Sequence, residues 1–127
     1  MNIVPTDVLA SVDLDIPCPP SVNEMYANSK NWKGRGRYKT ERYRVWQRAA
    51  EWDVKAAVRR TPVQGWSVVC LEVPAEARSD LDNRAKAALD LLQTHGLISD
   101  DRYVSTLLLR KNPDIEQGRA RLRVWPE

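Results

Sequence analysis

Apolar and polar residues alternate over several short stretches of this chain. Ala10, Val12, Leu14 and Ile16 alternate with polar side chains, which predicts a half-buried strand. Prolines at positions 17, 19 and 20 then end the strand and favour an extended segment. Three further strands are predicted over residues 66–73, 103–109 and 120–124, from their β-branched and aromatic residues or their alternation.

Two other stretches show the helical period. One apolar stripe comprises Tyr43, Trp46, Ala50, Val54 and Ala57, and it predicts a helix that Thr40 caps and that ends before Pro62. A second stripe comprises Leu81, Ala85, Ala88, Leu89 and Leu92, and it predicts a helix that Gly96 closes. Residues 23–38, with two glycines among basic residues, are predicted to form a flexible basic loop.

The order of these elements is β-α-β-α-β-β. It predicts an α+β fold, a mixed sheet of about four strands packed by two helices. The length of 127 residues suits a single domain. Cys18 and Cys70 are too few for a disulfide framework or a zinc site, and a single histidine excludes a His-rich metal site. With no long apolar run and no signal-peptide pattern, the expected location is the cytoplasm, away from membranes.

Charge is unevenly distributed along the chain. The net charge of +3 conceals a segment, residues 30–48, that contains eight Lys or Arg residues and only one acid. Such a block suits a polyanion, although a solvated loop and a charged helix face explain it equally well. The candidate nucleic-acid contacts are Lys30, Lys33, Arg35, Arg37, Lys39 and, further along, Arg78. Trp32 and Tyr38 lie in the same block, either to stack on an opened base or to anchor the loop.

Arginines also recur on one face of the last predicted strand. Arg119, Arg121 and Arg123 alternate there with apolar residues. They could contact phosphate, but a wet surface or an edge strand carries the same pattern.

Carboxylates gather around the second predicted helix. Asp80 and Asp82 stand where the helix begins, and Asp82, Lys86 and Asp90 recur every four residues on one face. Asp100 and Asp101 precede the next strand. Mg²⁺ prefers such hard oxygen ligands, and a bound metal with a nearby lysine can stabilise a phosphodiester under attack.

Ordinary structural roles could explain the same residues. Ser79 and Asp82 have the spacing of a capping box, and Asp82 with Lys86 that of a surface ion pair. Asp100 and Asp101 suit a turn. A strand–helix–strand unit also places the helix start and the next strand's entry at different ends, so the sequence leaves open whether Asp101 meets Asp80.

Three blocks of the chain resemble the RusA family of Holliday-junction resolvases. The first block is Pro-Pro-Ser-Val-Asn-Glu-Met-Tyr over residues 19–26. The second is Arg-Ser-Asp-Leu-Asp-Asn over residues 78–83, followed by Lys86 and Asp90. The third is Gly-Leu-Ile-Ser-Asp-Asp over residues 96–101. The similarity extends over roughly residues 12–125 and leaves a leader, residues 1–10, outside it.

The resemblance implies a homodimeric, Mg²⁺-dependent endonuclease that cuts four-way DNA junctions by paired nicks in recombination and repair. Mn²⁺ is an expected substitute, and no organic cofactor is implied. By position, Asp80, Asp82 and Asp101 are the implied metal-binding catalytic acids and Lys86 the implied catalytic lysine. Asp100, Asp90 and Asn83 are candidates for supporting roles.

A homodimer also suits the substrate, because a four-way junction has near two-fold symmetry and its resolution needs two symmetric cuts. Two other functions remain open from the residues alone. One is a non-catalytic protein that binds branched DNA through its basic segment and strand arginines. The other is a nuclease that acts mainly on flaps, forks or RNA.

Overall fold

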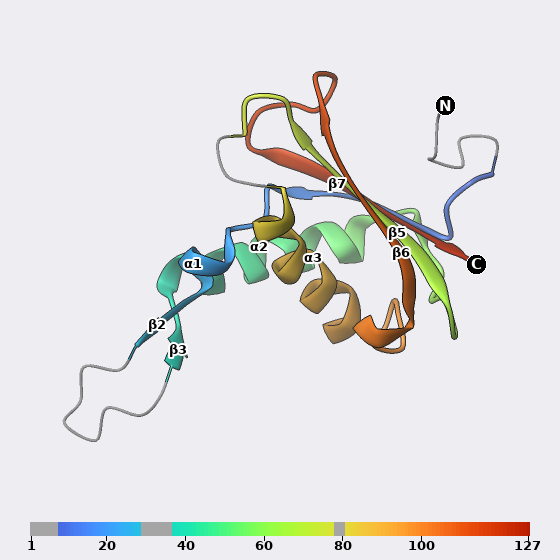
Figure 1. Ribbon diagram of the computed structural model, residues 1–127, viewed down its shortest axis with the longest axis horizontal. Coiled ribbons are helices and arrows are strands. Elements are labelled where there is room, and N and C mark those ends of the chain that lie inside the picture. Colours follow the sequence, from blue (N-terminus) through green and yellow to red (C-terminus); the bar gives the residue numbers. More distant parts are fainter. Residues whose placement is uncertain (1–7, 29–36, 78–80) are drawn as a thin grey trace.

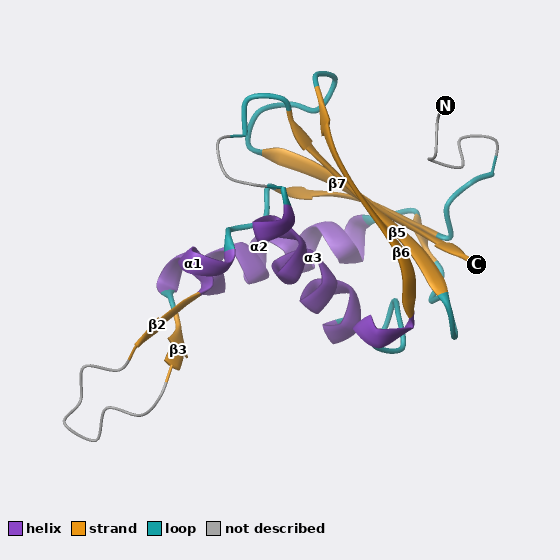
Figure 2. Ribbon diagram, in the orientation of Figure 1, coloured by secondary structure: helices purple, strands orange, loops and turns teal. Residues whose placement is uncertain are grey.

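A twisted five-stranded sheet with helices on one face forms the centre of the protein (Figures 1 and 2). It is seen in a computed structural model, which describes residues 8–28, 37–77 and 81–127. The strand order is β4-β1-β7-β5-β6. In chain order these strands are β1 (Val12–Pro17), β4 (Arg59–Arg60), β5 (Ser67–Pro74), β6 (Val104–Asn112) and β7 (Arg119–Pro126). β5 and β6 are parallel and the other pairs antiparallel, which confirms the mixed sheet.

The two predicted helices are confirmed as α2 (Glu41–Ala56) and α3 (Asp82–Thr94). Thr40 is the N-cap of α2, and its side chain accepts a hydrogen bond from Tyr43 N at 3.2 Å. The chain leaves α3 through Gly96, whose φ of 68° lies in the left-handed region that glycine adopts without strain. α3 connects β5 to its parallel neighbour β6.

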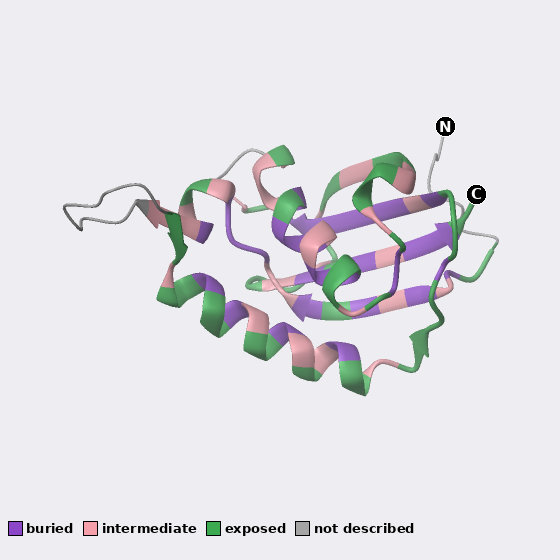
Figure 3. Cartoon of the chain, turned by 90° about the horizontal axis from the view of Figure 1, so that it is seen from below, coloured by how far each residue is buried: buried purple, intermediate pink, exposed green. Residues whose placement is uncertain are grey.

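The core lies between the sheet and these helices. Buried side chains alternate along β1 and most of β7, and β5 is buried along almost its whole length. The inward-facing side chains meet the apolar faces of α2 and α3, as the burial colours in Figure 3 show. Tyr43 is 1% exposed and Trp46 7%, so the aromatic residues of α2 face this core, as the periodicity predicted. Trp46 Nε1 donates to Pro17 O at 2.8 Å and thereby fixes the end of β1 to α2.

The predicted loop over residues 23–38 was wrong at its two ends, which form regular structure, and residues 29–36 lie outside the described part of the chain. A short helix, α1 (Val22–Met25), is followed by an antiparallel pair, β2 (Tyr26–Asn28) and β3 (Arg37–Lys39). At the start of α1, Ser21 N donates to Glu24 Oε1 at 2.9 Å. The sequence prediction missed this short helix because the preceding prolines favour an extended segment. The β2–β3 hairpin projects away from the sheet (Figure 1).

Two smaller differences also appear in the sheet and before β6. β4 adds a fifth strand that was not predicted, because it contains only two residues and both are arginines. A 3₁₀ turn, η1 (Asp101–Tyr103), precedes β6. In the described part of the chain no helix is long and apolar enough to span a bilayer.

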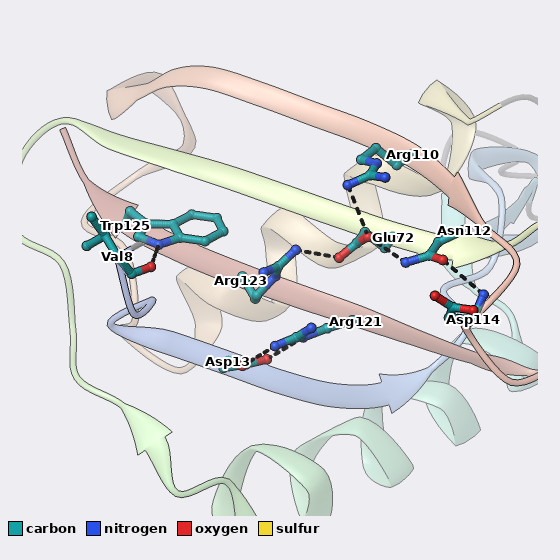
Figure 4. A network of polar contacts seen from close by, with 9 residues as sticks. All are labelled: Val8, Asp13, Glu72, Arg110, Asn112, Asp114, Arg121, Arg123 and Trp125. Atoms are coloured by element: carbon teal, nitrogen blue, oxygen red, sulfur yellow. Dashed lines mark hydrogen bonds and ion pairs between the residues drawn. The ribbon is translucent and has the colours of Figure 1, made fainter. Parts of the chain in front are cut away.

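The face of the sheet opposite the helices carries a network of charges (Figure 4). Arg121 Nη2 lies 2.8 Å from Asp13 Oδ2, and Arg123 pairs with the buried carboxylate of Glu72. Arg119 bonds to Asp15 at 3.1 Å and to Asp53 at 3.2 Å. β7 lies between β1 and β5, so it is a central strand rather than an edge strand. Its three arginines form ion pairs with carboxylates of this chain.

Candidate functional site

One face of α3 carries charged side chains from its first turn as far as Asp90. Asp82 and Lys86 are exposed, and Lys86 Nζ lies 3.0 Å from Asp90 Oδ1. Lys86 thus pairs with the acid that follows it, and the predicted Asp82–Lys86 pair is not the one formed. The helix begins at Asp82 with Leu81 as its N-cap, so Asp82 is not the third helical residue of a box capped by Ser79.

The hydrogen bond with Asp90 raises the pKa of Lys86, and the negative charges of Asp90 and, more weakly, Asp101 act in the same direction. The ammonium group therefore stays protonated at neutral pH. It can attract phosphate and stabilise negative charge, but it is poorly suited to act as a general base.

Asp90 also faces the first turns of α2. Burial raises the pKa of Tyr43 to about 12, and the nearby charge of Asp90 adds to the effect. A cavity of about 280 Å³ lies here, lined by Asp90 and Gln93 of α3, Tyr43 of α2, and Tyr26 and Lys39 of the hairpin. The foot of the basic hairpin is therefore next to the charged face of α3.

Asp100 and Asp101 lie beyond the other end of α3. Asp100 Oδ1 accepts a hydrogen bond from Arg102 N at 3.1 Å, and this bond holds the pKa of Asp100 below its usual value. Asp101 N donates to Gln93 Oε1 at 3.3 Å, which places Asp101 beside the last turn of the helix. Since α3 has 13 residues, at about 1.5 Å per residue its axis is roughly 20 Å long. Asp82 and Asp101 of one protomer are therefore at opposite ends of it.

Within residues 8–28, 37–77 and 81–127, no group of three or more His, Cys, Asp or Glu side chains is close enough to hold a metal ion. The expected ligands on and after α3 are carboxylates, which suits Mg²⁺ or Mn²⁺. The chemistry of these ligands fits the expected metal. One protomer's described residues do not supply a complete set.

Only some of the predicted nucleic-acid contacts fall on described residues. Arg37 and Lys39 are exposed on β3, and Tyr38 between them is 48% exposed. Arg37 lies over the Tyr26 ring, 5.2 Å from its centroid. Asn83 is in the first turn of α3 and half-buried. Outside the described residues lie Lys30, Trp32, Lys33, Arg35, Arg78 and Asp80.

Comparison with known families identifies the chain. A family model described as Endodeoxyribonuclease RusA matches residues 17–125. The chain belongs to the RusA family. It is therefore an endodeoxyribonuclease, and the family acts on branched DNA junctions. A comparison with curated proteins finds no match.

The structure brings together the first two blocks that resemble RusA proteins. Arg84 Nη1 donates to Pro19 O at 2.6 Å and approaches Cys18 Sγ at 3.7 Å. The proline segment is thus bonded to the first turn of α3, directly after the aspartate pair. Arg84 also lines a cavity of about 360 Å³ with Arg42, Glu76 and Gln117.

The sequence prediction missed Arg84, because it placed Asp82, Lys86 and Asp90 on the charged helix face and interpreted the prolines only as the end of a strand. The available signal was an arginine within the RusA-like aspartate block. Its partner, however, is a backbone carbonyl 65 residues away in the chain. The pattern of side chains along the sequence does not predict a contact with a distant backbone atom.

Proposed function

We propose that this RusA-family protein is a Mg²⁺-dependent endonuclease that resolves four-way DNA junctions by paired nicks in recombination and repair. The observation that carries the proposal is the contact between the basic hairpin and α3. Lys39 and Asp90 line one cavity, and Asp90 holds Lys86 at 3.0 Å. Groups that attract phosphate therefore lie beside the charged face of α3 that begins at Asp82.

Each polar residue has a distinct task in this proposal. Asp82, Asp101 and, from the resemblance, Asp80 would hold the metal, with Asp100 and Asn83 in support. When bound, Mg²⁺ would activate water and stabilise the charge that develops on the phosphate. Lys86, kept charged by Asp90, attracts the phosphate and offsets that charge. Arg37 and Lys39 hold the DNA backbone, which the acids alone would repel.

A homodimer would solve the separation of Asp82 from Asp101. If two copies of α3 lie side by side and antiparallel about a two-fold axis, Asp82 of one copy approaches the end of the helix that carries Asp101 in the other. Two equivalent sites then form, one for each strand to be cut. A symmetric junction needs this arrangement of two sites.

The free edge of β6 supports such a pairing. Among the described strands β6 pairs only with β5, so its other edge is free. With nine residues, β6 is the longest strand of the sheet. Leu107 on this strand is 38% exposed. Antiparallel pairing centred near Leu108 sets Arg110 and Lys111 opposite Thr106 and Ser105 of the second copy, so like charges do not meet. Because α3 connects β5 to β6, this pairing also brings the two α3 helices together.

A cleavage assay with a matched pair of variants tests the function. Wild-type protein should cut a labelled four-way junction symmetrically with Mg²⁺ and leave it intact with EDTA. Asp82→Asn should bind the junction as well as wild type or better, because it removes a charge that repels phosphate, but it should lose cleavage by at least a hundredfold. Asp114→Asn, in the exposed β6–β7 turn, is the control and should cut normally.

The alternatives predict different results in the same assay. Salt-sensitive binding without products at any metal concentration would favour a non-catalytic binder. Faster cleavage of flaps or forks than of junctions would assign a different substrate. Cleavage by Asp82→Asn at the wild-type rate would show that the site is wrongly placed.

A further inference from the structure

An exposed aromatic pair stands at the end of the sheet where β5 and β6 begin. The rings of Trp66 and Tyr103 meet edge to face, with centroids 5.4 Å apart and planes at 77°. The guanidinium of Arg102 lies 5.3 Å from the centroid of the Tyr103 ring. Trp66 is 55% exposed, and the side chain of Arg102 is 73% exposed. Tyr103 is half-buried, so the indole of Trp66 and the guanidinium of Arg102 face solvent with only part of the Tyr103 ring beside them.

The other tryptophans of the sheet region are placed differently. Trp46 and Trp125 are 7% and 3% exposed. Their indole nitrogens donate to Pro17 O at 2.8 Å and to Val8 O at 2.9 Å. Both serve packing. Trp66 leaves more than half of its surface in water, a costly position for the largest apolar side chain.

The surroundings of the pair are charged rather than apolar. Arg102 forms only a long ion pair with Asp100, at 3.8 Å and with both side chains substantially exposed. Exposed pairs of this kind are weak, so Arg102 can exchange Asp100 for a phosphate at little cost. A ring platform with an adjacent cation is the combination that binds single-stranded nucleic acid.

A short segment of backbone connects the aromatic pair to Asp101, one of the expected metal ligands. Asp101, Arg102 and Tyr103 form the single 3₁₀ turn η1. At about 2 Å per residue, Tyr103 is roughly 4 Å along the axis from Asp101. Tyr103 thus stands on the same short turn as Asp101, with the Trp66 ring against it. A base next to a phosphate at Asp101 would meet these rings.

We propose that Trp66 and Tyr103 form a stacking platform for an unpaired or unstacked nucleobase next to the cleaved phosphate, and that Arg102 binds the neighbouring phosphate. The proposal rests on the proposed function, because it uses the same DNA and the acid Asp101. It explains selectivity for branch points: the bases of a continuous duplex are stacked on one another, whereas those at a crossover are more easily exposed.

The test compares Trp66→Ala with Trp52→Ala. Trp52 on α2 is 74% exposed and also has a cation near its ring, Lys55 at 5.9 Å, but it lies outside the site. Binding is measured in EDTA with a four-way junction and with a linear duplex. A 2-aminopurine base at the crossover reports stacking through its fluorescence. Thermal unfolding and light scattering check that each variant is folded and keeps the oligomeric state of the wild type.

Trp66→Ala should lose about fivefold to 150-fold in junction affinity, which corresponds to ~1–3 kcal/mol per stacked base. Its duplex affinity should be unchanged, and the quenching of 2-aminopurine that wild type produces should disappear. Tyr103→Phe should behave as wild type because the ring remains, and Tyr103→Leu should resemble Trp66→Ala. Trp52→Ala should match wild type in every measurement.

Normal junction affinity and normal quenching in Trp66→Ala and Tyr103→Leu would overturn the platform while leaving the nuclease intact. An equal loss of junction and duplex binding, or a change of oligomeric state, would assign the rings to general binding or to a subunit interface instead. A wild-type protein that neither binds nor cuts junctions would instead refute the proposed function, so the two failures are distinct.

Discussion

Single side chains on α3 act through their neighbours. Lys86 is the expected catalytic lysine, and its protonation depends on Asp90, which bonds to it at 3.0 Å. Asp90 in turn lies beside Tyr43, whose hydroxyl stays protonated because burial raises its pKa to about 12. Asp90 thus contacts both the core and the lysine, and its supporting role stays a prediction.

Replacing Asp90 by Asn should lower the pKa of Lys86, because the hydrogen bond to a charged carboxylate is its largest stabilising influence. A raised pKa means that this pair stabilises the fold below about pH 10.5, the ordinary lysine value. That stability is lost as pH rises through the pKa of the folded state. NMR titration of the lysine side chains measures the change directly.

The matched control is Glu51→Gln on α2, which removes the partner of Lys55 at 3.1 Å. It should leave the titration of Lys86 unchanged. If Asp90→Asn also left it unchanged, the pairing of Lys86 with Asp90 would not exist in solution.

At the scale of elements, ion pairs connect neighbouring strands of the sheet on the face away from the helices. Glu72 on β5 is 2% exposed, and it contacts Arg123 on β7 and Arg110 and Asn112 on β6 (Figure 4). One carboxylate therefore connects three adjacent strands. The arginine pattern of the last strand, read from the sequence as a possible phosphate contact, belongs to this structural network.

Glu72→Gln should destabilise the protein by about 3–5 kcal/mol, because it leaves the guanidinium of Arg123 buried without a compensating charge. Urea unfolding followed by circular dichroism measures the loss. Glu51→Gln, which breaks an exposed pair, should cost less than about 1 kcal/mol. Equal effects of the two substitutions would contradict the buried network.

At the scale of the whole molecule, the proposed dimer would bring together the acids that are expected to hold a metal ion. A single copy holds Asp82 and Asp101 at opposite ends of α3, and the free edge of β6 is the surface that could join two copies. Leu107, partly exposed on that edge, would lie near the two-fold axis.

Leu107→Asp should convert the dimer to monomer, because it places a carboxylate opposite Leu109 of the partner subunit, in an apolar contact near the axis. Light scattering measures the mass, and calorimetry measures Mg²⁺ binding, which should weaken at least tenfold. Val58→Asp is the control, since Val58 is 97% exposed and lies just beyond α2. A Leu107→Asp protein that remained dimeric would place the interface elsewhere. Normal Mg²⁺ binding by a monomeric variant would show that one protomer suffices.

Local pattern was enough to predict the main elements. The apolar stripe from Tyr43 to Val54 faces the core, and Thr40 caps its helix. Both could be predicted because a 3.6-residue period and a side-chain cap depend only on residues close together in the sequence. The same argument gave the four longer strands and placed Lys86 and Asp90 on one face of α3. The aspartate and proline blocks also gave the family.

Contacts between distant segments were decided only by the tertiary structure. Strand order determines that β7 is central and that its arginines meet Asp13, Asp15 and Glu72, and no local period encodes that order. The bond from Arg84 to the Pro19 carbonyl and the meeting of Trp66 with Tyr103 depend on how whole elements pack. The sequence by itself thus determined which residues could do the chemistry. Folding decided which of them meet, because helix α3 holds Asp82 and Asp101 of one chain apart at its two ends.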